Sequence, residues 1–108
     1  MRKLLTFAVI LLFGVLSSAC VNTFAVHELN QIAAEYISAG DINSAIARLE
    51  SSIDLDGNIY ESRYNLAVSY MRVNQCQKAL DQILEAQKLV KTEEPAVYYT
   101  IGVSNTCL

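Results

Sequence analysis

The side chains of this chain that could do chemistry are three cysteines, Cys20, Cys76 and Cys107, and a single histidine, His27. A catalytic thiol needs a base beside it, and a redox centre often has two cysteines with two residues between them. The sequence contains no CxxC pair, no HExxH zinc pattern and no glycine-rich phosphate loop. No Cys or Asp is spaced to orient His27 as a base, so we interpret it as an ordinary surface or groove histidine. The sequence predicts no enzyme, no metal and no cofactor; an enzymatic or redox role would require a reactive thiol at Cys76 or Cys107.

The location of Cys20 bears on where the protein is found. Arg2 and Lys3 precede an apolar run over residues 4–16, and small residues lead from there to the cysteine. Charge, apolar run and small residues in that order are the parts of a secretory signal peptide. The run is shorter than the roughly 20 residues of a membrane-spanning helix. We therefore interpret residues 1–19 as a cleaved signal peptide.

The end of this segment resembles the bacterial lipobox, in which small residues precede a cysteine that is diacylated and becomes the mature N-terminus. Ser18 and Ala19 match that pattern, whereas the usual leucine three places before the cysteine is Ser17 here. The resemblance implies a lipoprotein of the cell envelope anchored through Cys20. Val21 follows in place of an acidic residue, which in this resemblance implies the periplasmic face of the outer membrane. Ordinary cleavage after Ala19, leaving Cys20 as a thiol, is the alternative.

The processed chain would be a lipidated tether over residues 20–25 and one domain over residues 26–108. Losing Arg2 and Lys3 removes two positive charges, so the formal net charge changes from −3 to −5. Nucleic acids and anionic membrane surfaces need clustered basic residues, and those of the processed part are scattered. The composition therefore argues against both as a partner surface.

A spacing of about 34 residues recurs through the predicted domain, and such a period indicates a repeat architecture. Large apolar, small and aromatic residues return in the same order after this repeat period. The pairs are Ile32 and Leu66, Ala33 and Ala67, Tyr36 and Tyr70, Ala45 and Ala79, Ile46 and Leu80, Leu49 and Ile83, and Leu55 and Leu89.

Each unit reads as two helices, because apolar residues fall at three- and four-residue steps. In the first turn, Gly40 can take the left-handed conformation that ends a helix and Asp41 can cap the next one. Asn74 takes the glycine's place in the second unit. At the end of the first unit we expect Asn58 as an N-cap, with Glu61 completing a capping box. A third unit begins near Pro95 and has one helix.

These residues resemble the tetratricopeptide repeat (TPR) family. The sequences Ile32-Ala33, Tyr36, Gly40-Asp41 and Ala45-Ile46, then Leu66-Ala67, Tyr70 and Ala79-Leu80, follow that family's order and spacing, and Ile101-Gly102 matches its start. The family's tryptophan and closing proline are missing. The resemblance implies an all-α fold, a short superhelix of five helices, with repeats over residues 26–59 and 60–93 and a half repeat over residues 94–108.

Cys76 and Cys107 are the candidate disulfide, since one cysteine of the three is expected to carry lipid in an exported chain. In the implied repeat geometry Cys76 starts one helix and Cys107 lies near the end of the antiparallel helix beside it. Two independent thiols are the alternative.

The resemblance implies a function as well, because the first helices of TPR units line a concave groove that binds a protein or peptide. The candidate groove residues are Asn30, Ile37, Tyr64, Asn65, Val68, Met71 and Tyr99. We expect a lipid-anchored adaptor of the cell envelope, such as an accessory of a pilus, a secretion channel or wall synthesis. The alternative is a dimeric envelope lipoprotein that pairs through the apolar flank of its open third repeat.

Overall fold

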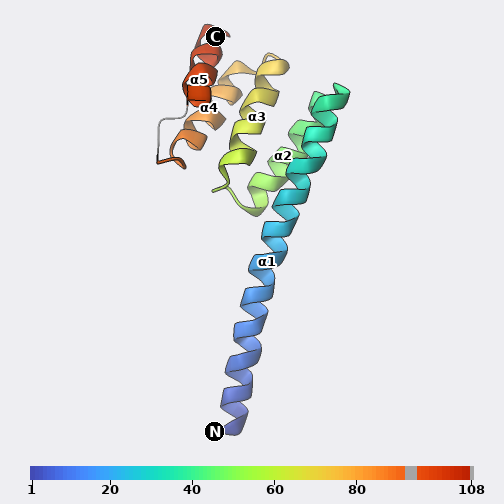
Figure 1. Ribbon diagram of the computed structural model, residues 1–108, viewed down its shortest axis with the longest axis vertical. Coiled ribbons are helices and arrows are strands. Elements are labelled where there is room, and N and C mark those ends of the chain that lie inside the picture. The colour runs from blue at the N-terminus through green and yellow to red at the C-terminus, as the bar shows by residue number, and fades with distance from the viewer. Residues whose placement is uncertain (92–94, 108) are drawn as a thin grey trace.

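The computed structural model describes residues 1–91 and 95–107, and the side chains of residues 12–20 lie outside that description. Every regular element in the described residues is a helix, which confirms the all-α prediction (Figure 1). The helices are α1 (Arg2–Ala39), α2 (Ile42–Leu55), α3 (Tyr60–Arg72), α4 (Cys76–Gln87) and α5 (Pro95–Cys107).

The N-terminal half of α1 projects away from the other helices (Figure 1). The described apolar side chains of α1 as far as residue 24 lie open to solvent, as Phe7 does at 70% exposure and Phe24 at 67%. Among the described side chains, that of Val26 is the first along the chain to be buried. In the part of the chain that the structure describes, no helix is long and apolar enough to cross a membrane.

The segment expected to be a tether, residues 20–25, is helical in this uncleaved chain and continues α1 without a break. The physical reason is local, because neither glycine nor proline separates the apolar run from the first packed helix. A helix that has already formed extends at little cost through such residues.

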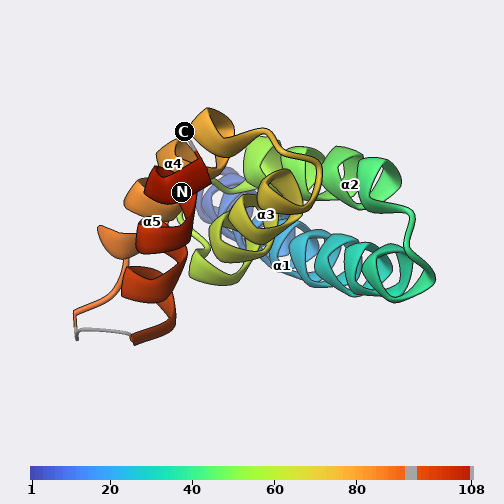
Figure 2. The ribbon, with the colours of Figure 1, turned by 90° about the horizontal axis from the view of Figure 1, so that it is seen from above.

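The helices pack in chain order, each against the next, from α1 to α5. In addition, the backbone of α3 lies close to those of both α1 and α5, whereas no Cα atoms of α2 and α4 approach within 8 Å of each other among the described residues. The first helices therefore form one layer and the second helices another. Figure 2 shows these layers from above, with α2 and α4 along the upper side of the view and the other three along the lower side.

The two turns within the helix pairs have the same geometry at equivalent positions of the repeat. Gly40 has φ 81° and Asn74 has φ 59°, both in the left-handed region that ends a helix. These are the positions where the sequence predicts such residues. The hydrogen bonds also repeat: Gly40 N to Ile37 O (3.1 Å) and Asp41 N to Tyr36 O (2.9 Å), then Asn74 N to Met71 O (3.1 Å) and Gln75 N to Tyr70 O (2.9 Å).

The predicted cap of α2 is confirmed, whereas the predicted cap of α3 is wrong. The Asp41 carboxylate accepts a hydrogen bond from Ser44 N at 3.2 Å. Asn58 was expected to cap α3, but the N-cap residue is Ile59, which makes no side-chain cap bond. Instead the Asn58 N–H donates to the Asp56 carboxylate at 2.9 Å. This local turn places Asn58 one residue too early to cap the helix.

The buried core of the described residues consists of two clusters, one toward each end of the helix stack. The first joins α1, α2, α3 and the start of α4, and the second joins α3, α4 and α5. Three of the repeat-related pairs are fully buried in both units, and two of these pairs are alanines, which let the helices approach closely. They are Ala33 and Ala67, Ala45 and Ala79, and Leu49 and Ile83.

Candidate functional site

The predicted pair of cysteines forms a disulfide between α4 and α5. Cys76 is the first residue of α4 and Cys107 the last of α5, and their Cα atoms are 5.8 Å apart. Cys76 is buried, whereas Cys107 is exposed. The predicted lipidation of Cys20 concerns a side chain outside the described residues.

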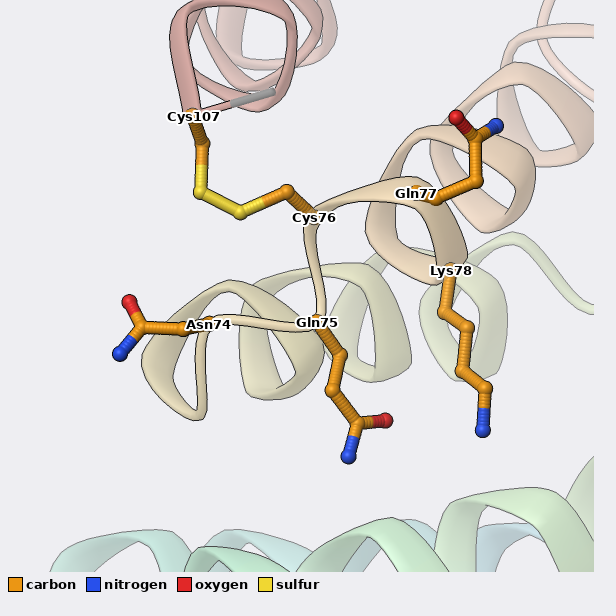
Figure 3. Close-up of a pocket in the computed structure, with 6 residues that line it drawn as sticks. All are labelled: Asn74, Gln75, Cys76, Gln77, Lys78 and Cys107. Atoms are coloured by element: carbon orange, nitrogen blue, oxygen red, sulfur yellow. A yellow bond between two sulfur atoms is a disulfide. The ribbon is translucent and has the colours of Figure 1, made fainter.

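A hollow of about 430 Å³ opens beside this disulfide. It is lined by Asn74, Gln75, Cys76, Gln77, Lys78 and Cys107. Figure 3 shows the disulfide at one side of this group, with the Gln75 and Lys78 side chains pointing away from it. The lining is formed by the turn before α4, the first residues of α4 and the end of α5.

Asn30 was predicted to face a binding groove, and the structure corrects this. Its side chain is 3% exposed. The amide nitrogen donates to the Val26 carbonyl at 3.0 Å and to Ser62 Oγ at 2.8 Å, and Ser52 Oγ lies 3.3 Å away and shares one of these two N–H groups. The two serine hydroxyls are fully buried and lie 2.8 Å apart. Asn30 therefore joins α1, α2 and α3 from within, because the end of α2 and the start of α3 cover it.

Ile37 and Met71, the candidate groove residues that precede the two turns, are half-buried and pack against the first core cluster. They occupy equivalent positions in the two units. Each has part of its surface against the core and part exposed. They border the outer surface of the α1 and α3 layer.

The candidates Tyr64, Asn65 and Val68 lie on α3, and all three are half-buried. Tyr64 packs against the second core cluster and stacks on Tyr60 with ring centroids 5.7 Å apart. Such a stacked ring has few rotamers left to lose when a ligand binds. The middle helix of the layer thus presents a partly covered surface of mixed polarity.

The tyrosines of α5 are far more exposed than those of α3. Tyr99 is 75% exposed and its neighbour Tyr98 is 48% exposed. Tyr99, a predicted groove residue, belongs to the layer of first helices, beside α3. Exposed tyrosines offer apolar area and a hydroxyl together, which suits contact with another protein.

The sequence analysis missed a polar cluster that spans α2, α3 and α4. The Tyr70 hydroxyl donates to Glu50 Oε1 at 2.5 Å, and Lys78 Nζ lies 5.6 Å from the centre of the Tyr70 ring. Burial, and then the hydrogen bond to Glu50 and its negative charge, raises the pKa of Tyr70 well above its ordinary value of 10.0. Tyr70 therefore keeps its proton and acts as a donor. Of the three residues in this cluster, only Tyr70 could be singled out from the sequence, because it recurs one repeat period after Tyr36.

The single histidine of the chain lies at the surface, outside both core clusters. His27 lies exposed on α1. Within the described ranges, no three His, Cys, Asp or Glu side chains gather so as to hold a metal ion. What remains is a surface with exposed tyrosines and a disulfide at one edge.

No model of a known protein family matches this chain, and the search of curated proteins finds no match either.

Proposed function

We propose that this protein is a lipid-anchored adaptor of the bacterial cell envelope that binds a protein or peptide on the layer formed by α1, α3 and α5. Its domain would be a short TPR superhelix of two repeats and a half repeat. The equivalent turns at Gly40 and Asn74, and the buried pairs that recur at equivalent positions of the two units, support the repeat assignment.

The observation that carries the binding proposal is the surface of this layer. The helix α3, on which Tyr64 and Val68 are half-buried, lies next to α5, on which Tyr99 is exposed. An adaptor needs apolar and aromatic contact area that is held in place before the partner arrives. Packing on the second core cluster holds Tyr64 in this way.

Two features support export to the envelope. The first is the N-terminal pattern of charge, apolar run and small residues that ends at Cys20. The second is the disulfide between Cys76 and Cys107, because structural disulfides persist mainly in oxidising compartments. Pilus, secretion and wall-synthesis assemblies are the candidate settings, and the periplasmic face of the outer membrane is the candidate location.

A second candidate function, pairing of two copies through the open third unit, is favoured by the one-sided burial of α5. The middle helix α3 is covered by α2 on one side and α4 on the other, whereas α5 contacts α3 and α4 only, among the described residues. Gly102 on α5 is exposed, and Ile101 beside it is only half-buried. A second copy could cover this face.

A site-specific photo-crosslinker in the full chain, expressed in intact bacterial cells, separates the two functions. We expect a crosslinker at Val68 or Tyr99 to give an adduct with another protein. The matched control is Ala47, an exposed residue of α2 on the opposite layer, and it should give none. Adducts of equal yield at Ala47 would contradict binding on the first-helix layer. An adduct of twice the chain mass from a crosslinker at Tyr98 would establish the dimer instead.

Membrane attachment is tested by Cys20→Ser. If Cys20 carries lipid, the wild-type protein partitions with membranes and incorporates labelled palmitate, whereas the variant does neither. Equal partitioning and labelling of both proteins would contradict the lipid anchor. Cys107→Ser is the control, because this cysteine lies in the disulfide.

A further inference from the structure

We propose that the Cys76–Cys107 disulfide is a modification site, which a dithiol reductant opens on the folded protein by attack at Cys107, and that its reduction releases α5 from α3 and α4. The reductant is identified by its chemistry, a pair of thiols that can pass two electrons to a surface disulfide. This inference is independent of what the first-helix layer binds.

Solvent and a reductant can reach the disulfide from the Cys107 side only. Cys76 is 6% exposed, whereas Cys107 is exposed at the end of α5. The hollow of about 430 Å³ lies against both sulfur-bearing residues (Figure 3). Thiol–disulfide exchange requires the attacking thiolate to reach one sulfur atom. The geometry therefore favours attack on Cys107 and makes Cys76 the leaving group.

The position of Cys76 suits a leaving thiolate. It is the first residue of α4, and the N-cap residue Gln75 makes no side-chain cap hydrogen bond. Amide N–H groups and the positive end of the helix dipole favour negative charge at such a position. A better-stabilised leaving thiolate departs faster.

The exchange balances in two steps. In the first, a thiolate of the reductant attacks Cys107 Sγ; a new S–S bond forms there, the Cys107–Cys76 bond breaks, and its electron pair leaves on Cys76 Sγ. In the second step, the other thiolate of the reductant attacks the reductant sulfur that is bonded to Cys107 Sγ. A disulfide forms within the reductant, and Cys107 leaves as a thiolate. The reductant is oxidised to a disulfide, and the two cysteines gain two electrons and, once protonated, two protons.

Few buried side chains join α5 to the rest of the protein, so the covalent bond supplies a large part of its attachment. The buried side chains of α5 among the described residues are Val97, Thr100 and Ser104. The Thr100 hydroxyl bonds Ala96 O in its own helix, and Ser104 Oγ has no hydrogen-bond partner among the described residues. Val97 is the one fully buried apolar side chain that α5 contributes in this part of the chain, and the half-buried Ile101 also packs against the second core cluster. Release of α5 would uncover Ala67 and Ile83 of the second core cluster.

The first experiment traps the mixed disulfide on the full chain. Cys20→Ser removes the third thiol. A dithiol oxidoreductase lacking its resolving cysteine is then mixed with the folded, oxidised protein without denaturant. We expect peptide mapping to place the reductant on Cys107. A mixed disulfide on Cys76, or none until the protein is unfolded, would overturn the proposal.

The second experiment measures what reduction does to α5. We expect amide hydrogen exchange over residues 95–107 to speed up by about tenfold or more after dithiothreitol treatment, since the helix loses its attachment. Exchange over α2 should not change. Equal α5 exchange in the oxidised and reduced protein would contradict the release step. Cys76→Ser with Cys107→Ser should reproduce the reduced pattern without any reductant.

A matched pair of variants tests the leaving group. Gln75→Asp places a carboxylate at the N-cap, where it takes the N–H groups that would stabilise the Cys76 thiolate. We expect reduction by dithiothreitol to slow about threefold or more. Gln31→Asp makes the same substitution at an exposed position of α1, away from the disulfide, and is the control. An equal effect of the two variants, or no effect of Gln75→Asp, would contradict the role of the helix start.

Discussion

The two junctions that join successive helix pairs have similar geometry and opposite chemistry. In the first, α1, α2 and α3 meet at the buried polar cluster of Asn30, Ser52 and Ser62. In the second, α3, α4 and α5 meet at an apolar contact in which Ala86 packs with Val97, beside Tyr64. Ala86 and Tyr64 stand one repeat period after Ser52 and Asn30, respectively.

This difference shows two ways of attaching a helix to a small stack. The polar junction is held by directional hydrogen bonds in a buried site, although Asn30 Oδ1 itself has no hydrogen-bond partner among the described residues. The apolar junction has little buried area on α5 and is closed by the Cys76–Cys107 disulfide. The first junction depends on hydrogen bonding, and the second depends on oxidation.

Removing the disulfide should have the largest effect. Cys76→Ser with Cys107→Ser opens a loop with a sequence separation of 31 residues, and we expect the free energy of unfolding to fall by roughly 3 to 4 kcal/mol. Urea denaturation of the oxidised wild type and the variant measures it. A loss below about 1 kcal/mol would mean that the disulfide adds little to the stability of the fold.

Removing the asparagine of the polar junction should have the next largest effect on the free energy of unfolding. Asn30→Ala leaves two buried serines without their shared donor and creates a small void, and we expect a loss of about 2 to 3 kcal/mol. Ser52→Ala installs the residue that the second junction has at Ala86, and should cost about 1 kcal/mol because Asn30 keeps Ser62. Equal costs of the two variants in urea denaturation would contradict the central place of Asn30.

The hydrogen bond between Tyr70 and Glu50 predicts an alkaline limit to stability. The pKa of Tyr70 is raised in the folded protein. The contribution of protonated Tyr70 to the free energy of unfolding is therefore fully present below the ordinary pKa of 10.0, and it is lost as the pH rises above that value. We expect the free energy of unfolding to fall by up to about 1.4 kcal/mol per pH unit there.

Tyr70→Phe should remove that part of the alkaline slope, whereas Tyr36→Phe, the equivalent position in the first unit, should keep it. Denaturation in urea between pH 9 and 11 separates the variants. The same slope in Tyr70→Phe and wild type would show that other groups cause it.

Two glycine substitutions should give small effects of opposite sign. Gly40 has φ 81° and an added Cβ would meet no atom within 4 Å, so Gly40→Ala costs only backbone strain, about 1 to 2 kcal/mol. Gly102 lies inside α5 with equally open space. Gly102→Ala should therefore stabilise α5 by about 0.5 to 1 kcal/mol. Thermal unfolding of each variant measures both, and a stabilising Gly40→Ala would contradict the turn geometry.

The local features of the fold could be predicted from the sequence. The starts of α2 and α4, the left-handed residues Gly40 and Asn74, and the Asp41 cap all follow from residues within a few positions of each other. Glycine and asparagine tolerate the left-handed region, and aspartate accepts from the first free N–H groups, whatever the rest of the chain does. The Asn58 cap failed for the same reason, because Asp56 competed for the N–H of Asn58.

Only part of the candidate site could be predicted from the sequence. The pairing of Cys76 with Cys107 could be predicted from their places in the repeat, since the start of one helix lies beside the end of its antiparallel neighbour. Tyr99 was correctly expected at the surface. Asn30 was also expected at the surface, and this was wrong. Helical spacing defines a face of the helix but not which other helix covers that face.

The sequence by itself determined the repeat period, the helix ends at Gly40 and Asn74 and the pair of cysteines that can meet. Those features depend on residue type and spacing along the chain. Only the tertiary structure decided that Asn30 is buried with two serines, that Glu50 meets Tyr70, and that α5 is covered on one side. Each of these depends on burial and on partners 10 to 32 residues away, which are set by how the helices pack.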